Sequence, residues 1–175
     1  TLWHTLSLHD ALPILRNPIV IRDVTEAFAD SEFQAFSRTI EKGGVVRAVP
    51  VKNIAGKPRS FFDNMIAYAQ SIGSKGLAYM TWSGGEVKSP IAKFLSAERI
   101  EKIAEACAAE DGDVVFFVCA AEKEAVRIAG DVRIRLGKEL ELLEEDVFRF
   151  CWIVDFPMFE WSEEENRWDP AHHMF

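Results

Sequence analysis

The chain has 175 residues, of which 49% are hydrophobic, and its formal net charge is −8 at pH 7. This length is enough for one sizeable domain, or for one domain and part of another, and the apolar content can form a core. The acidic balance argues against a general nucleic-acid-binding surface, because non-specific affinity for phosphate comes from an excess of Lys and Arg. Any contact with RNA must therefore be local.

The three cysteines, Cys107, Cys119 and Cys151, are odd in number and widely spaced. This pattern indicates neither a disulfide framework nor a metal knuckle, and a reducing cytoplasm fits it best. No apolar run approaches the roughly 18 to 20 residues of a membrane span. We therefore expect a cytoplasmic protein without membrane contact and without a metal site.

The first fourteen residues, "TLWHTLSLHDALPI", have neither the basic start nor the clean apolar run of a signal peptide. We interpret residues 1–14 as a non-native segment derived from a sequencing adapter, or as a disordered terminus. Under either interpretation His4 and His9 have no function, and they are excluded from the candidate site.

The first element of the native part is a strand from Val45, because "VVRAVPVK" alternates and is rich in β-branched residues. Pro50 favours an edge position for this strand in the sheet. A helix follows in "SFFDNMIAYAQSIG", where Ser60 is the predicted N-cap with Asp63 three residues on, and Gly73 is the stop signal. Its apolar residues fall on one face, namely Phe62, Met65, Ile66, Ala69 and Ile72.

The next predicted strand is "GLAYMTW", and after a Gly84–Gly85 turn "SPIAKFL" is a possible short strand beginning at Pro90. Ser96 then opens a second helix, with Leu95 and Ile100 spaced as a hydrophobic staple. A buried stripe is expected at Ile100, Ile103, Ala104 and Cys107.

A turn and an apolar strand are predicted in "DGDVVFFVCA". A third helix from Glu122 to Leu136 follows, weakened by Gly130. The order strand, helix, strand, strand, helix, strand, helix predicts an α+β fold of two layers, a small sheet with helices on one face.

The chain changes character after "ELLEEDVF", the one plausible domain boundary. The run "RFCWIVDFPMFEW" is typical of a strand buried in a large sheet. A polar loop, "SEEENR", separates it from a returning strand that starts at Trp168. Because a hairpin alone is marginally stable, we expect its partner sheet in sequence beyond this chain.

Two adjacent histidines, His172 and His173, are the candidate site. Successive side chains of a strand point to opposite faces, so only one imidazole can face a given pocket. Adjacent spacing is not a usual zinc pattern. The residues alone leave open a structural role and a catalytic or ligand-binding role.

Other candidate sites have simpler interpretations. Asp155 is costly to bury unless it is paired or hydrogen-bonded, and we interpret it as hydrogen-bonded to backbone at a strand end rather than as a functional group. The glycines around Lys75 suggest a phosphate loop, but they follow a helix and precede a strand, the reverse of what such a loop needs. We read them as a helix C-cap. Lys52, Lys57 and Arg59 are interpreted as a solvated edge rather than an RNA platform.

The segments "GSKGLAYM", "SPIAKFL", "DGDVVFF", "WIVDFPMFE" and "HHMF" stand in an order that resembles the bacterial-type aspartyl-tRNA synthetase family. The middle of the chain resembles the GAD domain, which is inserted into the catalytic domain of that family and also occurs in the amidotransferase B subunit. The resemblance implies a GAD-like inserted domain at 17–147 and part of a class II catalytic domain, with its antiparallel sheet, at 148–175. Met174 stands where the family has proline.

The resemblance also implies a function. The parent enzyme, an aspartate–tRNA ligase, would activate L-aspartate with ATP and Mg²⁺ and transfer it to tRNA(Asp), as a homodimer. It implies that His172 binds aspartate, with His173 the weaker candidate, and it assigns no catalytic residue to this chain. The class II ATP-binding motifs are absent, so we expect the chain alone to be inactive and to bind no cofactor. The alternatives are a stand-alone GAD-type module that binds RNA or protein, and an amidotransferase B subunit.

Overall fold

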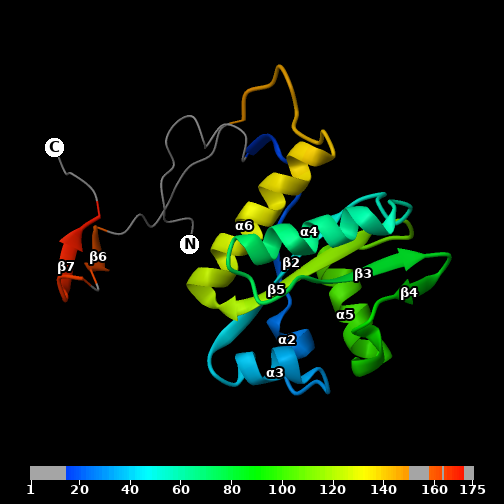
Figure 1. Ribbon diagram of the computed structural model, residues 1–175, viewed down its shortest axis with the longest axis horizontal. Coiled ribbons are helices and arrows are strands. Elements are labelled where there is room, and N and C mark those ends of the chain that lie inside the picture. The colour runs from blue at the N-terminus through cyan, green and yellow to red at the C-terminus, as the bar shows by residue number, and fades with distance from the viewer. Residues whose placement is uncertain (1–14, 150–157, 163, 172–175) are drawn as a thin grey trace.

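The chain forms a five-stranded sheet surrounded by helices, and a two-stranded sheet near its C-terminus (Figure 1). The computed structural model describes residues 15–149, 158–162 and 164–171. The predictions for residues 1–14, for the strand through Asp155 and for the two histidines lie outside the described residues.

All neighbours in the five-stranded sheet are antiparallel, in the order β1-β2-β5-β3-β4. The central strand, β5, is the apolar run predicted from "DGDVVFFVCA". It pairs with β2 over eight residues, from Gly44 opposite Ala121 to Val51 opposite Val114. The strands are β1 (Arg22–Asp23), β2 (Gly44–Val51), β3 (Ala78–Ser83), β4 (Glu86–Lys88) and β5 (Val114–Ala121).

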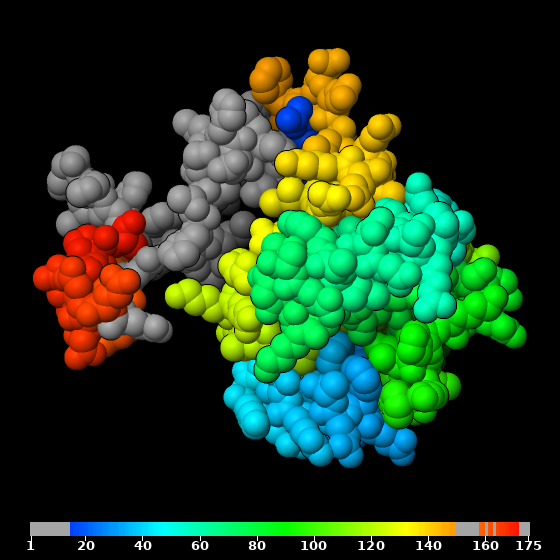
Figure 2. Space-filling model, in the orientation of Figure 1, coloured from blue at the N-terminus to red at the C-terminus, as the bar shows by residue number. Residues whose placement is uncertain are grey.

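Helices cover both faces of this sheet. They are α2 (Thr25–Phe28), α3 (Gln34–Ile40), α4 (Arg59–Ser71), α5 (Ala97–Cys107) and α6 (Glu122–Glu139), with a 3-10 turn, η1 (Ala92–Phe94). Figure 2 shows α4 and α6 side by side on the visible face. The other helices pack on the opposite face.

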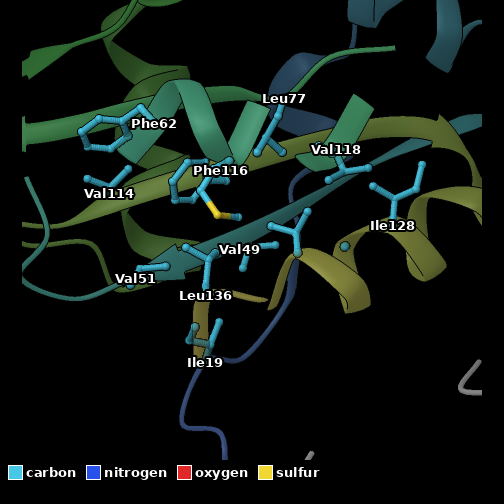
Figure 3. Close-up of a cluster of buried hydrophobic side chains, with 14 of the residues drawn as sticks. Ile19, Val49, Val51, Phe62, Leu77, Val114, Phe116, Val118, Ile128 and Leu136 are labelled. Carbon is cyan, nitrogen blue, oxygen red and sulfur yellow. The ribbon is translucent and has the colours of Figure 1, made fainter. Parts of the chain in front are cut away.

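The first core lies between the sheet and the pair α4 and α6. Phe116 and Val118 of β5 point into it together with Val49 of β2 (Figure 3). They meet buried side chains of both helices, because alternate residues of a strand share a face. The helix residues are Phe62, Met65, Ala69, Ala125, Ile128, Ala129, Val132 and Leu136.

The second core lies on the other face, where the intervening residues of the same strands point. Phe28 of α2 is fully buried and packs edge-on against Phe117 of β5, with ring centroids 5.3 Å apart. Ile103 and Cys107 of α5 close this core. The stripe predicted for α5 is therefore confirmed at its two most buried positions.

The α+β class is confirmed, but the expectation of helices on one face is wrong. The sequence pattern did not predict β1, α2 and α3, which precede the first predicted strand. The two helices have only four and seven residues, and neither has a side-chain cap. Short helices carry little periodic signal of their own, and tertiary packing around Phe28 and Phe36 holds these two in place.

Pro50 does not put β2 at the edge of the sheet, because β2 has β1 and β5 as neighbours. The backbone carbonyl of Val46 accepts a hydrogen bond from Val24 on the β1 side, at 3.1 Å. Pro50, four residues further on, faces the same side, but the ladder with β1 stops at Ala48. Its missing N–H therefore costs no hydrogen bond with β1.

Three other local predictions change. Helix α4 begins at Arg59, and Ser60 makes no capping hydrogen bond. The strand after the Gly84–Gly85 turn is β4, whereas "SPIAKFL" contains the 3-10 turn η1. Helix α6 runs three residues past the predicted Leu136. The cap of α5 is as predicted: Ser96 Oγ accepts from the Arg99 backbone N–H at 3.4 Å.

The second sheet is a hairpin of β6 (Phe159–Ser162) and β7 (Arg167–Pro170). Its turn falls in the polar segment predicted as a loop, and β7 includes the start of the predicted returning strand. Among the described residues, no helix is both long and apolar enough to cross a bilayer.

Candidate functional site

The predicted site residues, His172 and His173, lie just past the last described residue, Ala171. The hairpin leading to them is described. Its ladder pairs Phe159 with Pro170, and the Ala171 backbone N–H donates to the Met158 carbonyl at 3.0 Å. The chain therefore reaches the two histidines from a hydrogen-bonded strand pair.

The hairpin carries an exposed aromatic surface. Trp161 and Trp168 are directly opposite in the ladder, and their rings meet edge to face with centroids 5.6 Å apart. Their exposed fractions are 48% and 65%, and Met158 and Phe159 are also exposed. Clustered exposed apolar side chains mark a surface that another element covers. This agrees with the expected partner sheet, which stays a prediction.

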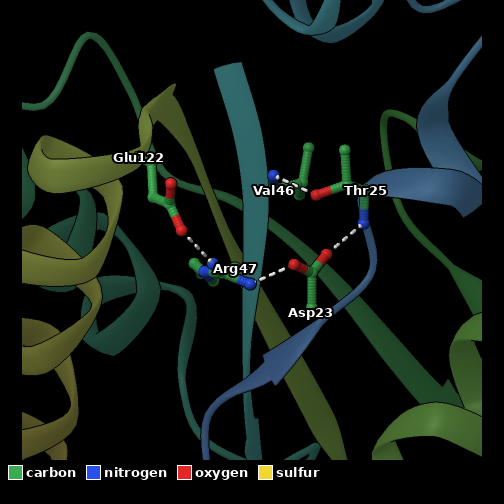
Figure 4. A network of polar contacts seen from close by, with 5 residues as sticks. All are labelled: Asp23, Thr25, Val46, Arg47 and Glu122. Carbon is green, nitrogen blue, oxygen red and sulfur yellow. Dashed lines mark hydrogen bonds and ion pairs between the residues drawn. The ribbon is translucent and has the colours of Figure 1, made fainter. Parts of the chain in front are cut away.

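An ion-pair network at one side of the main sheet is structural. Arg47 of β2 lies between Asp23 and Glu122 and pairs with both, the latter at 3.4 Å (Figure 4). The Thr25 hydroxyl accepts from the Val46 N–H at 2.9 Å. Burial raises the pKa of Asp23, but hydrogen bonds from Thr25 and the charge of Arg47 outweigh it and leave the pKa below its ordinary value. Each of these groups already has a partner within the fold.

A second buried carboxylate, Asp113, joins two loops. Its side chain is 3% exposed and accepts from Lys52 Nζ at 2.8 Å. It also accepts from the backbone N–H groups of Asn53 and Glu110, at 3.0 and 2.8 Å. Burial raises the pKa of Asp113, yet these donors together hold it below the ordinary value. The arrangement holds the end of β2 against the turn before β5.

The two thiols that the structure describes, Cys107 and Cys119, are poor nucleophiles. Burial raises the pKa of Cys107 to about 11, and burial also raises that of Cys119, although Thr39 and Lys75 oppose the shift. Both thiols are therefore protonated at neutral pH, and a thiol in this state does not attack. Among the residues that the structure describes, no group of three or more His, Cys, Asp or Glu side chains could hold a metal ion.

The surface of the main domain has a hollow of about 190 Å³ at one end of the sheet, which we call the basic hollow. Three exposed cations surround it, from the C-terminal part of α3, the turn after α3 and the loop after α4. Its lining residues are Arg38, Thr39, Lys42, Gly44, Lys75 and Ala121. The order of elements around Lys75 argued against a phosphate loop there. No pattern in the sequence predicts that Lys75 lies near Arg38 and Lys42.

A second hollow, of about 310 Å³, lies between the segment before β1 and the segment after α6. It is lined by Arg16, Asp146, Val147 and Phe148, and nearby the Glu144 backbone N–H donates to the Arg16 carbonyl at 3.1 Å. The segment before β1 and the segment after α6 are therefore adjacent.

The GAD domain family model matches residues 36–129. The chain belongs to this family. The match runs from within α3 to within α6, so the GAD domain contains the basic hollow and Asp113. The hairpin β6–β7 lies outside it.

Curated relatives extend the likeness beyond the GAD domain. The aspartate–tRNA(Asp/Asn) ligase of Ehrlichia chaffeensis is 48% identical over 178 residues, which cover 97% of this chain and 30% of that protein. The ligase of the same name from Rickettsia felis is 50% identical over 164 residues, or 93% and 27% of the two chains. The resemblance drawn from the motifs is confirmed: the chain aligns with a GAD-containing segment of aspartate–tRNA ligases.

The chain thus spans less than a third of the length of these relatives. Among solved structures, a hypothetical protein from Pyrococcus horikoshii OT3 aligns with a TM-score of 0.38 and 21% identity, over 63% of this chain and 68% of that one. This likeness is too loose to carry an argument about fold or function.

Proposed function

We propose that the chain is part of an aspartate–tRNA ligase. The complete enzyme activates L-aspartate with ATP and Mg²⁺ in the cytoplasm and transfers the aspartyl group to tRNA. The observation that carries this proposal is the 48% identity over 97% of the chain, which extends past the GAD domain through the aromatic hairpin. A GAD domain that occurs in otherwise unrelated proteins would explain sequence similarity over residues 36–129 alone.

The proposal extends to two tRNAs. The curated relatives carry both tRNA(Asp) and tRNA(Asn) in their names. The complete enzyme would then aspartylate both, as a homodimer. Charging each transcript separately tests this extension, because an enzyme restricted to tRNA(Asp) would leave tRNA(Asn) uncharged.

Aspartate activation is assigned to the complete enzyme and not to this chain. The support is the length of the chain, which spans only 30% and 27% of the two relatives that carry the ligase name. We expect aspartate-dependent exchange between ATP and pyrophosphate in the full-length protein and none in residues 1–175. Exchange catalysed by the chain alone would contradict this assignment.

The proposed domain division puts the GAD-like inserted domain at 17–147 and part of the catalytic domain at 148–175. The adjacency of Arg16 and Glu144 supports it, since the ends of an inserted domain must return to one place. Limited proteolysis should cut after α6 and spare residues 45–136. Cleavage spread evenly through 45–136 would refute the division.

Within the catalytic part we propose that His172 binds the substrate aspartate and that His173 faces away. The support is the family resemblance of "HHMF" and the alternation of side chains along a strand. A stand-alone GAD-type binding module is the rival, and the reading frame after Phe175 discriminates between them. A class II ATP-binding motif there supports the ligase, and a stop codon supports the module.

A further inference from the structure

We propose that the basic hollow of the GAD domain binds a backbone phosphate of RNA. The proposal rests on the proposed function, because a ligase that charges tRNA supplies the polyanion. It differs from the sequence expectation, which placed no phosphate site in this region.

The basic hollow gathers cations from segments that are distant in sequence. Arg38 lies on α3, Lys42 in the turn between α3 and β2, and Lys75 in the loop between α4 and β3. In Figure 1 these segments lie at the same end of the sheet, beside the start of α6. That end is where the first residue of β2, Gly44, pairs with the last residue of β5, Ala121.

None of the three cations is neutralised within the part of the chain that the structure describes. Arg38 Nη2 donates to the uncharged amide oxygen of Gln34 at 2.7 Å, and no described carboxylate lies within 4.0 Å of the charged groups of Lys42 or Lys75. By contrast, Lys102 on α5 pairs with Glu98 at 2.8 Å. The three cations of the basic hollow thus have no described ion-pair partner, although the chain as a whole has a formal net charge of −8. Their mutual repulsion is relieved by an anion placed between them.

Gly44 lines the basic hollow without a side chain. A Cβ atom at Gly44 would lie 2.6 Å from Thr39 Cγ2 and 2.9 Å from the Ala120 carbonyl oxygen, so no larger residue fits without a backbone shift. Ala121 precedes α6 and provides no side-chain cap. Glu122 and Glu124 in the first turn of α6 offset the helix dipole. The positive charge therefore comes from the three side chains.

The exposed positions of the cations favour a polymer over a small anion. Three flexible side chains in water hold a single free phosphate weakly, because salt screens them. An RNA strand adds contacts elsewhere on the enzyme, and each phosphate that is neutralised releases counterions. A chain of net charge −8 can offer such a contact only locally. A phosphate contact positions RNA without reading its sequence, so it would serve tRNA(Asp) and tRNA(Asn) equally.

The test compares two triple variants of the full-length ligase. The first, Arg38→Gln with Lys42→Gln and Lys75→Gln, removes the cations of the basic hollow. The second is a matched control with the same charge change at exposed cations that form no ion pair among the described residues, Arg22→Gln with Lys88→Gln and Lys138→Gln. Thermal unfolding checks that both variants fold like the wild type.

Dissociation constants for tRNA are measured across a salt series. The hollow triple should bind about tenfold more weakly near 0.1 M salt, and the slope of log affinity against log salt should fall by about 1. The control triple should stay within about twofold of the wild type. An equal loss in both triples, or an unchanged slope in the hollow triple, would overturn the proposal.

The proposed function is read separately, from aspartate-dependent exchange between ATP and pyrophosphate without tRNA. Absence of exchange in the wild-type enzyme counts against the proposed function. Exchange together with wild-type tRNA affinity in the hollow triple overturns the phosphate site alone.

Discussion

Asp113 and Lys52, 61 positions apart in the sequence, form an ion pair at 2.8 Å that fastens the end of β2 to the turn before β5. The two side chains differ in burial, since Asp113 is 3% exposed and Lys52 is 51% exposed. Removing the carboxylate leaves the ammonium in water, whereas the two backbone donors that bind Asp113 lose an acceptor inside the fold. Most of the stability that is lost with this ion pair should therefore come from the unsatisfied backbone donors around Asp113.

The first prediction concerns Asp113→Asn. The amide keeps one oxygen, so it cannot accept from Lys52 and from two backbone N–H groups as the carboxylate does. We expect the free energy of unfolding to fall by about 1–3 kcal/mol, the usual cost of an unsatisfied buried donor. Urea unfolding of residues 15–149 measures it. Glu110→Gln is the control, because Glu110 is 83% exposed and pairs with Lys52 at 3.6 Å, and it should change stability little. Equal effects of the two substitutions would disprove the role given to Asp113.

The second prediction is the acid dependence of stability. The pKa values of Asp113 and Asp23 both lie below the ordinary 3.8 in the folded protein. Between the folded values and 3.8 the unfolded chain binds more protons, so stability rises with pH there. The contribution is fully present well above pH 3.8 and is lost as the pH falls through the lower folded values. Urea midpoints from pH 6 to pH 3 should fall less steeply in Asp113→Asn than in the wild type, and parallel curves would contradict this.

The third prediction uses two glycines of α6. A Cβ atom at Gly137 would lie 2.3 Å from Asn17 Nδ2, whereas a Cβ at Gly130 meets nothing within 4 Å. Asn17 cannot easily move, because it is buried and its amide donates to the Arg133 carbonyl at 2.9 Å. Gly137→Ala should therefore destabilise the domain by about 1–3 kcal/mol. Gly130→Ala should stabilise it by roughly 0.5–1 kcal/mol, since alanine is the better helix former.

Thermal and urea unfolding of the two variants measure the difference. In a protein that already carries Asn17→Ala, Gly137→Ala should cost almost no further stability, because the amide with which its Cβ would clash is gone. If Gly137→Ala were as favourable as Gly130→Ala, the N-terminal segment would not be docked on α6 as described.

Sequence patterns predicted the long elements, including α5, but placed all helices on one face of the sheet and missed α2 and α3. The alternation in β2 and the stripe on α5 are local, so they could be read directly. The run "VVFFV" in β5 carried the missing signal: a strand apolar at every position is buried on both faces. Helices were therefore needed on the second face, and residues 22–40 supply two of them.

The candidate sites were less predictable for a physical reason. Asp113 finds its partners through the β2–β5 pairing, and the cations of the basic hollow meet only because α3, α4 and β5 end at one side of the sheet. The spacing of these residues in the sequence does not predict that their side chains meet in the fold. Lys75 was singled out because of its glycines, but its neighbours Arg38 and Lys42 were 37 and 33 positions away.

The last prediction concerns the two histidines in the full-length enzyme. Two adjacent residues of a strand point to opposite faces, so only one of the two imidazoles can face a given pocket. The family resemblance favours His172. A donor to a buried anionic substrate contributes about 1.5–3 kcal/mol. His172→Ala should therefore lower kcat/KM for aspartate by about one to two orders of magnitude. His173→Ala should lower mainly the thermal midpoint. Steady-state kinetics and thermal unfolding of both variants test the assignment. A larger activation defect in His173→Ala than in His172→Ala, with the folded fraction of both variants unchanged, would show that the facing assigned to the two histidines is wrong.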